Sequence, residues 1–129
     1  YTYSGHPVGA AAALACLAET KRLKVNENAA ARGAELHAGL LALQDKHEVI
    51  GDVRGGHGLM CAIELVSDRA TKAPIDKKSS GTVQEVAYRS GAMVRISGPN
   101  VILSPPLVLT SEDVQVILSS LDAGLSAVN

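Results

Sequence analysis

In Gly51-Asp52-Val53-Arg54-Gly55-Gly56-His57-Gly58-Leu59-Met60, a glycine-rich turn lies between two short apolar segments. Glycine adopts the positive φ angles of tight turns without strain, so Gly55, Gly56 and Gly58 predict a turn. Val49 to Val53 and Leu59 to Val66 are expected to be the flanking strands. Because the turn joins two strands rather than a strand and a helix, a structural hairpin is favoured over a phosphate-binding loop. One face of the second strand is expected to carry Leu59, Cys61, Ile63 and Leu65.

Two helices are expected before this hairpin. Val8 to Leu23 is apolar on every side up to Glu19, and such a helix normally lies buried within a larger body. A second helix is expected to run to about Lys46, with Asn26 as its N-cap. Its apolar residues recur at spacings of four and three, which turns one stripe inward. The stripe consists of Ala29, Gly33, Leu36, Leu40 and Leu43.

The second half of the chain is expected to add a loop, a helix and two short strands. Ser67 to Ser80 is polar and predicts a surface loop, which Gly81 to Arg89 follows as a helix. Ala92 to Ile96 and Val101 to Leu103 predict strands on either side of a turn from Ser97 to Asn100.

The last helix has a clear starting signal. Thr110 or Ser111 is expected to cap it, and Glu112 and Asp113 favour the positive end of the helix dipole. Its core face consists of Val114, Ile117, Leu118, Leu121 and Leu125. The resulting order α-α-β-β-α-β-β-α predicts a small mixed α/β domain of the α+β kind, with a small sheet covered by helices on one face.

Composition and charge exclude several classes of protein. With 12 Lys and Arg against 13 Asp and Glu, the net charge of -1 gives no electrostatic reason to expect nucleic acid as a partner. No apolar run approaches the roughly 18 residues of a membrane span, and the four histidines lack metal-ligand spacing. Cys16 and Cys61 are expected to be buried free thiols of a reduced, cytoplasmic protein.

The first residues, Tyr1-Thr2-Tyr3-Ser4-Gly5-His6-Pro7, place hydroxyl groups and a glycine before an Ala-rich helix that begins at a proline. Unpaired N–H groups and the positive dipole end make a helix start suitable for an anion such as a phosphate. The chain has no initiator Met and starts within this motif, so we expect it to be a piece of a longer protein. Taken alone it contains no convincing catalytic set, since GxSxG, GxxxxGK[ST] and GxGxxG motifs are all missing from the sequence.

Three segments in order resemble the C-terminal third of class III aminotransferases, which are pyridoxal-phosphate (PLP) enzymes of fold type I. They are residues 1–7, residues 51–60 and the sequence Ser-Pro-Pro-Leu-Val at 104–108. The resemblance implies that residues 1–24 form a helix and cofactor-phosphate segment of the large domain. It also implies that residues 25–129 form the C-terminal small domain, and that the parent protein is a homodimer.

The resemblance assigns roles to a few residues. Thr2 would contact the cofactor phosphate of the partner subunit, with Tyr1 beside it; the alternative role of Thr2 is a plain cap residue. Arg95 matches the arginine with which ω-amino-acid:pyruvate-type members bind a substrate carboxylate; its alternative role is a solvated charge at a strand end. Ornithine-type members carry an arginine shortly before the Pro-Pro pair, where this chain has Ile102, Leu103 and Ser104. Arg54 is expected to be structural and to pair with Asp52 or Glu64.

The Schiff-base lysine and the Asp that pairs with the pyridine nitrogen lie upstream in this family, so we expect no catalytic residue here. The chain alone should be inactive and bind PLP weakly or not at all. The parent is expected to move an amino group between an amine or ω-amino acid and pyruvate or a similar keto acid. Two alternatives remain: an aminomutase, epimerase or decarboxylase of the same fold, and a non-enzymatic dimerisation or ligand-binding module.

Overall fold

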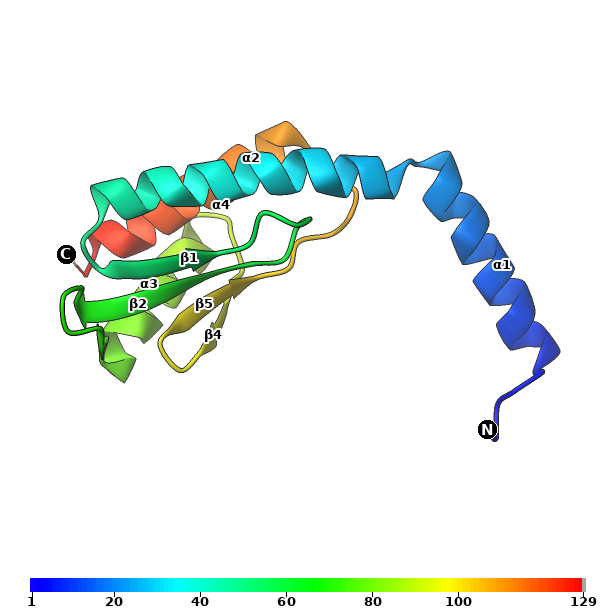
Figure 1. Ribbon diagram of the computed structural model, residues 1–129, viewed down its shortest axis with the longest axis horizontal. Coiled ribbons are helices and arrows are strands. Elements are labelled where there is room, and N and C mark those ends of the chain that lie inside the picture. Colours follow the sequence, from blue (N-terminus) through cyan, green and yellow to red (C-terminus); the bar gives the residue numbers. More distant parts are fainter. Residues whose placement is uncertain (129) are drawn as a thin grey trace.

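The computed structural model describes residues 1–128 and shows an antiparallel sheet with helices packed against one face (Figure 1). The order of elements is the predicted one, with one additional short strand. The elements are α1 (Pro7–Arg22), α2 (Val25–Lys46), β1 (Ile50–Arg54), β2 (Cys61–Asp68), β3 (Ala73–Pro74), α3 (Lys77–Arg89), β4 (Arg95–Ser97), β5 (Asn100–Leu103) and α4 (Ser111–Ser126).

The sheet follows the order β1-β2-β5-β4, and β3 pairs with the end of β2. All of these pairings are antiparallel. The glycine-rich turn joins β1 and β2 as predicted, and Gly55, Gly56 and Gly58 all have positive φ angles. One row of side chains crosses the sheet on its buried face: Val53, Ile63, Val101 and Ile96.

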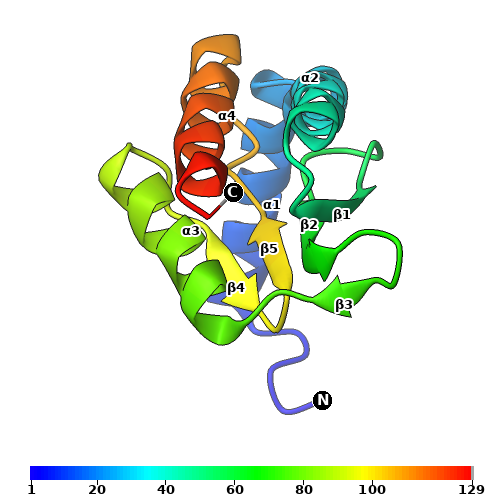
Figure 2. The same ribbon diagram turned by 90° about the vertical axis from the view of Figure 1, so that its left-hand side faces the viewer.

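Helices α2, α3 and α4 cover this face, and Figure 2 shows α3 and α4 side by side next to β4 and β5. The predicted stripe of α2 is buried. The predicted strand face of Leu59, Cys61, Ile63 and Leu65 is buried too, although β2 starts only at Cys61 and leaves Leu59 in the preceding turn segment. On α4, Val114, Leu121 and Leu125 are buried while Ile117 and Leu118 pack against the core from its margin. The prediction of a mixed α/β fold with helices on one face is therefore confirmed.

Helix α1 extends away from this body and buries none of its residues (Figure 1). Its exposure corrects one prediction: Cys16 is exposed, whereas Cys61 is buried. Burial raises the pKa of the Cys61 thiol, and a hydrogen bond from the Gly56 backbone partly opposes that effect.

The predicted cap of α2 is wrong, because α2 starts at Val25 after Lys24, whose φ of 49° is left-handed. The two-residue link between the helices leaves Asn26 inside the helix.

The predicted surface loop from Ser67 to Ser80 is only partly correct. Strand β2 continues to Asp68, β3 pairs with it, and α3 starts at Lys77 rather than at Gly81. Asp76 causes this early start, because its Oδ1 accepts hydrogen bonds from the N–H groups of Lys78 (2.9 Å) and Ser79 (3.0 Å). Further on, the predicted strand from Ala92 to Ile96 is shorter and shifted, since β4 covers Arg95–Ser97.

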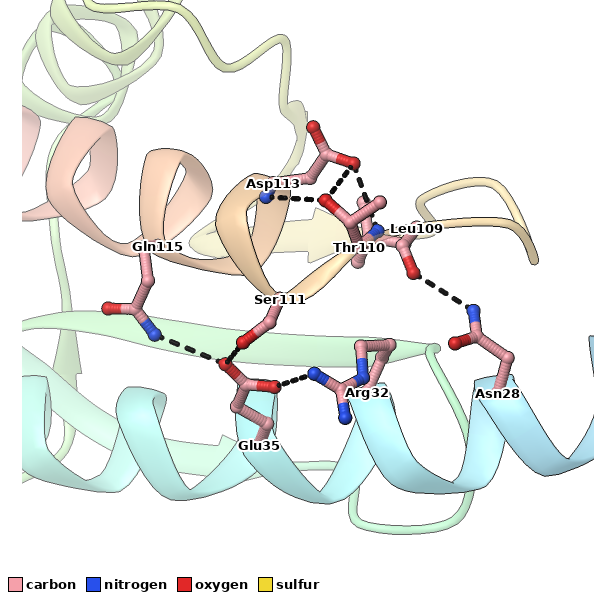
Figure 3. A network of polar contacts seen from close by, with 8 residues as sticks. All are labelled: Asn28, Arg32, Glu35, Leu109, Thr110, Ser111, Asp113 and Gln115. Carbon is pink, nitrogen blue, oxygen red and sulfur yellow. Dashed lines mark hydrogen bonds and ion pairs between the residues drawn. The ribbon is translucent and has the colours of Figure 1, made fainter.

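A polar network joins α2 to the start of α4 (Figure 3). Glu35 on α2 accepts hydrogen bonds from Ser111 Oγ (2.6 Å) and Gln115 Nε2 (3.2 Å), and Arg32 Nη1 lies 2.5 Å from its other oxygen. The Ser111 bond is the main cause of the lowered pKa of Glu35. Of the two predicted caps, Thr110 is the N-cap of α4, and it forms a capping box with Asp113. The network fixes α4, and with it the helical layer, over the sheet.

Candidate functional site

The N-terminal segment forms two successive turns that lead into α1. The Ser4 N–H donates to the Tyr1 carbonyl (3.1 Å), and the His6 N–H donates to the Tyr3 carbonyl (3.3 Å). His6 is the N-cap of α1, and its Nδ1 accepts a hydrogen bond from the Gly9 N–H (3.3 Å). The alternative in which Thr2 is the helix cap is thus not what the structure shows. Thr2 is exposed, with its hydroxyl close in sequence to a helix start.

This segment has the chemistry that a phosphate group requires. Gly5 has a φ of 74°, a left-handed conformation that turns the chain toward the helix start without strain. Pro7 at the first helical position removes one donor, while the positive end of the dipole of α1 remains. A hydroxyl and main-chain N–H groups make charge-assisted hydrogen bonds to a phosphate. The residues present therefore fit the phosphate end of PLP.

Arg95 lies on the face of the sheet that the helices leave open. Arg54, Ala62, Ile102 and Arg95 form one row across the sheet, from β1 through β2 and β5 to β4. Because side chains alternate along a strand, this row lies opposite the buried row that contains Val101. Arg54 and Arg95 thus project from the same face, one at each edge of the four-stranded path.

The two arginines differ in their partners. Arg54 Nη1 lies 3.2 Å from Asp52 Oδ2 and 3.0 Å from Glu64 Oε2, which confirms the predicted structural pairing. Arg22, Arg32, Arg69 and Arg89 each pair with a glutamate. Within residues 1–128, Arg95 is the one arginine that has no carboxylate within ion-pair distance. Its exposed guanidinium is therefore available to an external carboxylate.

A surface groove of about 560 Å³ runs beside Arg95. Apolar side chains line much of it: Ile102 on β5, Ile117 on α4, Met93 in the segment before β4, and the Pro105-Pro106 pair after β5. A cation at the margin of an apolar groove suits a small molecule with one carboxylate and a less polar remainder.

The structure does not bring Thr2 and Arg95 together. The N-terminal segment lies at the far end of α1, and the sheet lies at the other side of the molecule (Figure 1).

All lysine side chains are exposed: Lys21, Lys24, Lys46, Lys72, Lys77 and Lys78. Among the described residues there is no cluster of His, Cys, Asp or Glu that could hold a metal ion, and no helix long and apolar enough to cross a membrane.

Two residues near Arg95 were not singled out by the sequence. Gln84 Nε2 donates to the Val94 carbonyl (2.9 Å), and Asn100 Nδ2 donates to the Ser97 carbonyl (3.2 Å). The sequence predicts only a turn at Asn100, and no sequence feature marks Gln84. Amide side chains give no motif of their own, because their role depends on which carbonyl the fold brings into reach.

Comparison with known proteins places the chain in a family. The family profile described as aminotransferase class-III matches residues 1–125. The taurine–pyruvate aminotransferase of Bilophila wadsworthia is 35% identical over 134 residues, which cover 98% of this chain and 29% of that protein. The ethanolamine-phosphate phospho-lyase homolog 1 of Caenorhabditis elegans is 34% identical over 131 residues, which cover 99% of this chain and 28% of that protein.

A solved structure agrees with these sequences. The amine transaminase from an uncultivated Pseudomonas species, in its PLP-bound form, is 41% identical and superposes with a TM-score of 0.91. The match covers 100% of this chain and 29% of that chain. The chain thus spans less than a third of the length of these relatives and matches them along almost all of its own length. It belongs to the class III aminotransferase family of PLP-dependent enzymes.

Proposed function

We propose that this chain forms the C-terminal part of a transaminase subunit that moves an amino group between an amine or ω-amino acid and pyruvate or a similar keto acid. The observation that carries the proposal is Arg95, an exposed guanidinium without a carboxylate partner in the described chain, at the margin of an apolar groove. A planar guanidinium binds a carboxylate through two parallel hydrogen bonds. The names of the taurine–pyruvate relative and the amine transaminase support the same two substrate classes.

The division of the chain follows from the same proposal. Residues 1–24 belong to the large domain and residues 25–129 form the small domain. Thr2, with Tyr1 beside it, contacts the phosphate of PLP held by the partner subunit of a homodimer. Residues 1–6 are exposed and α1 buries none of its residues, which supports the assignment, because both surfaces are free to meet another body.

PLP supplies the electron sink for transamination when it is bound. Thr2 binds and orients the phosphate end of the cofactor, and Arg95 binds and orients the carboxylate of the substrate.

The lysine that holds PLP is proposed to lie outside the chain, since each lysine here is exposed to solvent. We therefore expect the 129-residue chain alone to bind PLP more weakly than about 1 mM. Equilibrium dialysis checks this, and tight binding that borohydride fixes to one of these lysines would contradict it.

The proposed function is tested on the complete subunit that carries this chain, loaded with PLP. Pyruvate is supplied with a panel of amino donors, including a simple amine, taurine and β-alanine, and alanine formation is measured. Amino transfer predicts alanine in an amount equal to the donor consumed. A product formed from the donor in the absence of any keto acid, with no alanine formed in its presence, would reject the proposal.

A second candidate is a reaction of another class on the same scaffold, such as an aminomutase, epimerase, decarboxylase or lyase. The specific observation in its favour is the 34% identity to a relative named as a phospho-lyase. Reactions of this kind need no second substrate. The assay without keto acid therefore separates the two candidates directly.

A further inference from the structure

Strand β4, which carries Arg95, is a weak structural element by itself. It is three residues long, Arg95–Ser97, and pairs only with β5 at the edge of the sheet. Edge strands of this length have few backbone hydrogen bonds to hold them. The position of the Arg95 guanidinium therefore depends on contacts from outside the strand.

One such contact comes from the helical layer. Gln84 Nε2 on α3 donates a hydrogen bond of 2.9 Å to the carbonyl of Val94, the residue directly before Arg95. Helix α3 holds Gln84 in a fixed position, because the neighbouring side chains of Val83 and Ala87 on the same helix are fully buried in the core. The bond holds the start of β4 from the helix side of the sheet.

A second contact crosses the open face of the sheet. Asn100 Nδ2 donates to the Ser97 carbonyl (3.2 Å), and Asn100 Oδ1 accepts from Arg54 Nη2. Arg54 is held in turn by Asp52 on β1 and Glu64 on β2. This relay from β1 to β5 fixes the end of β4, two residues after Arg95.

The carbonyls of Val94 and Ser97, which bracket Arg95, are thus both bound by neutral amide groups. Neutral donors hold the strand without pairing with the guanidinium, whereas a nearby carboxylate would compete with the substrate for it. We propose that Gln84 and Asn100 are positioning residues that orient Arg95 for the substrate carboxylate. This inference rests on the proposed function of Arg95 as the carboxylate-binding group.

The test uses the complete PLP-loaded subunit and the variant Gln84→Met, which keeps the length of the side chain but removes the donor. We expect the KM for pyruvate to rise about 3- to 10-fold, the range for loss of one neutral hydrogen bond, with the half-reaction of a carboxylate-free amine unchanged. Gln44→Met is the matched control, since Gln44 Nε2 donates to the Gly51 carbonyl (3.3 Å) on β1, away from Arg95. Equal effects of the two variants, or equal losses in both half-reactions, would overturn the inference.

The relay is tested with Asn100→Ala, Arg54→Lys and the double variant. Because Arg54 acts through Asn100, the double variant should affect the KM for pyruvate no more than Asn100→Ala does. In an Arg95→Ala background, Gln84→Met should cause no further rise. Additive effects in either cycle would show that these residues act independently of Arg95 and of each other.

A readout without substrate separates this inference from the proposed function. Amide hydrogen exchange across β4 should be faster in Gln84→Met and Asn100→Ala than in the wild type, and unchanged in Gln44→Met. If exchange responds as expected but Arg95→Ala leaves the pyruvate reaction intact, the proposed function of Arg95 fails while the fixing of β4 stands. If exchange across β4 does not respond, the positioning role is rejected whatever Arg95 binds.

Discussion

Arg54 and Arg95 are identical side chains in one row of the sheet, yet their surroundings give them different tasks. Arg54 lies among Asp52, Glu64 and Asn100, so its charge is used within the protein. Arg95, at the opposite edge, has no such carboxylate in the described chain and faces solvent. An unpaired guanidinium is available for a ligand, and this difference in partners distinguishes a structural arginine from a binding one.

Asp122 on α4 illustrates a residue whose charge serves stability. Its carboxylate lies 2.7 Å from Lys46 Nζ and 2.6 Å from His47 Nε2 at the end of α2. The hydrogen bond from Lys46 first, and that from His47 second, lower the pKa of Asp122. Because the folded pKa lies below the unfolded value of about 3.9, the stabilisation is complete above that value and is lost as the pH falls through the folded pKa.

We therefore expect Asp122→Asn to lower the free energy of unfolding by about 1 kcal/mol at neutral pH. The difference from the wild type should shrink as the pH falls below about 4. Urea unfolding of both proteins over a pH series measures it, with Asp45→Asn, an exposed carboxyl on α2, as the control. A difference that stays constant down to low pH would mean that the charge of Asp122 is not what stabilises the contact.

At the scale of elements, close packing between α2 and the glycine-rich turn sets the position of the hairpin. A Cβ at Gly33 would overlap the carbonyl group of Gly58, so the helix approaches the turn along its backbone. Gly33 lies in the buried stripe of α2, where its missing side chain allows this contact. The turn and the helix thus fit only with glycine at this position.

Gly33→Ala should destabilise the chain by about 1–3 kcal/mol, as expected for overpacking against backbone that cannot move aside. Gly81→Ala on α3 is the matched control, because nothing lies within 4 Å of the added Cβ there. That control should gain about 0.4–1 kcal/mol. Urea unfolding compares the two variants, and a neutral result for Gly33→Ala would show that α2 and the turn are not in close contact.

Sequence patterns predicted well the elements that depend on local residue spacing, such as a buried stripe, an alternating strand or a helix cap. The stripe of α2, the alternation of β2 and the N-cap of α4 follow from residues close together in the chain. The start of α2 was missed because the link after α1, with Lys24 in a left-handed conformation, overrides the capping preference of Asn26. Gln84 was missed because its bond to Val94 exists only after α3 packs beside β4.

At the scale of the whole molecule, α1 is the element that the rest of the chain leaves uncovered (Figure 1). Val8, Leu14 and Leu17 are 70%, 69% and 60% exposed. Exposed apolar side chains gathered on one helix often mark contact with another body. In the longer relatives, the part that this chain does not match is more than twice as long as the part that it matches. Cys16 was expected to be buried because the helix pattern is that of an interior helix, and only the arrangement of the elements exposes it.

We expect the 129-residue chain on its own to self-associate through α1. Sedimentation velocity over a range of concentrations should show reversible dimers or larger species, because apolar surface on one copy can cover that on another. Leu14→Lys with Leu17→Lys should restore the monomer, whereas Leu41→Lys on α2 should not, since Leu41 lies outside α1. A well-folded wild-type monomer at every concentration would contradict this expectation.

The role of Arg95 is tested by the substitution Arg95→Ala in the complete PLP-loaded subunit, with each half-reaction followed separately. We expect kcat/KM for pyruvate to fall at least about 30-fold, as when a bidentate charge pair loses one partner. The half-reaction of a carboxylate-free amine should stay within about twofold, and Arg95→Lys should recover only part of the loss, because an ammonium lacks the planar fork. Equal losses in both half-reactions, or no loss with pyruvate, would contradict the assignment of Arg95 as the group that binds the substrate carboxylate.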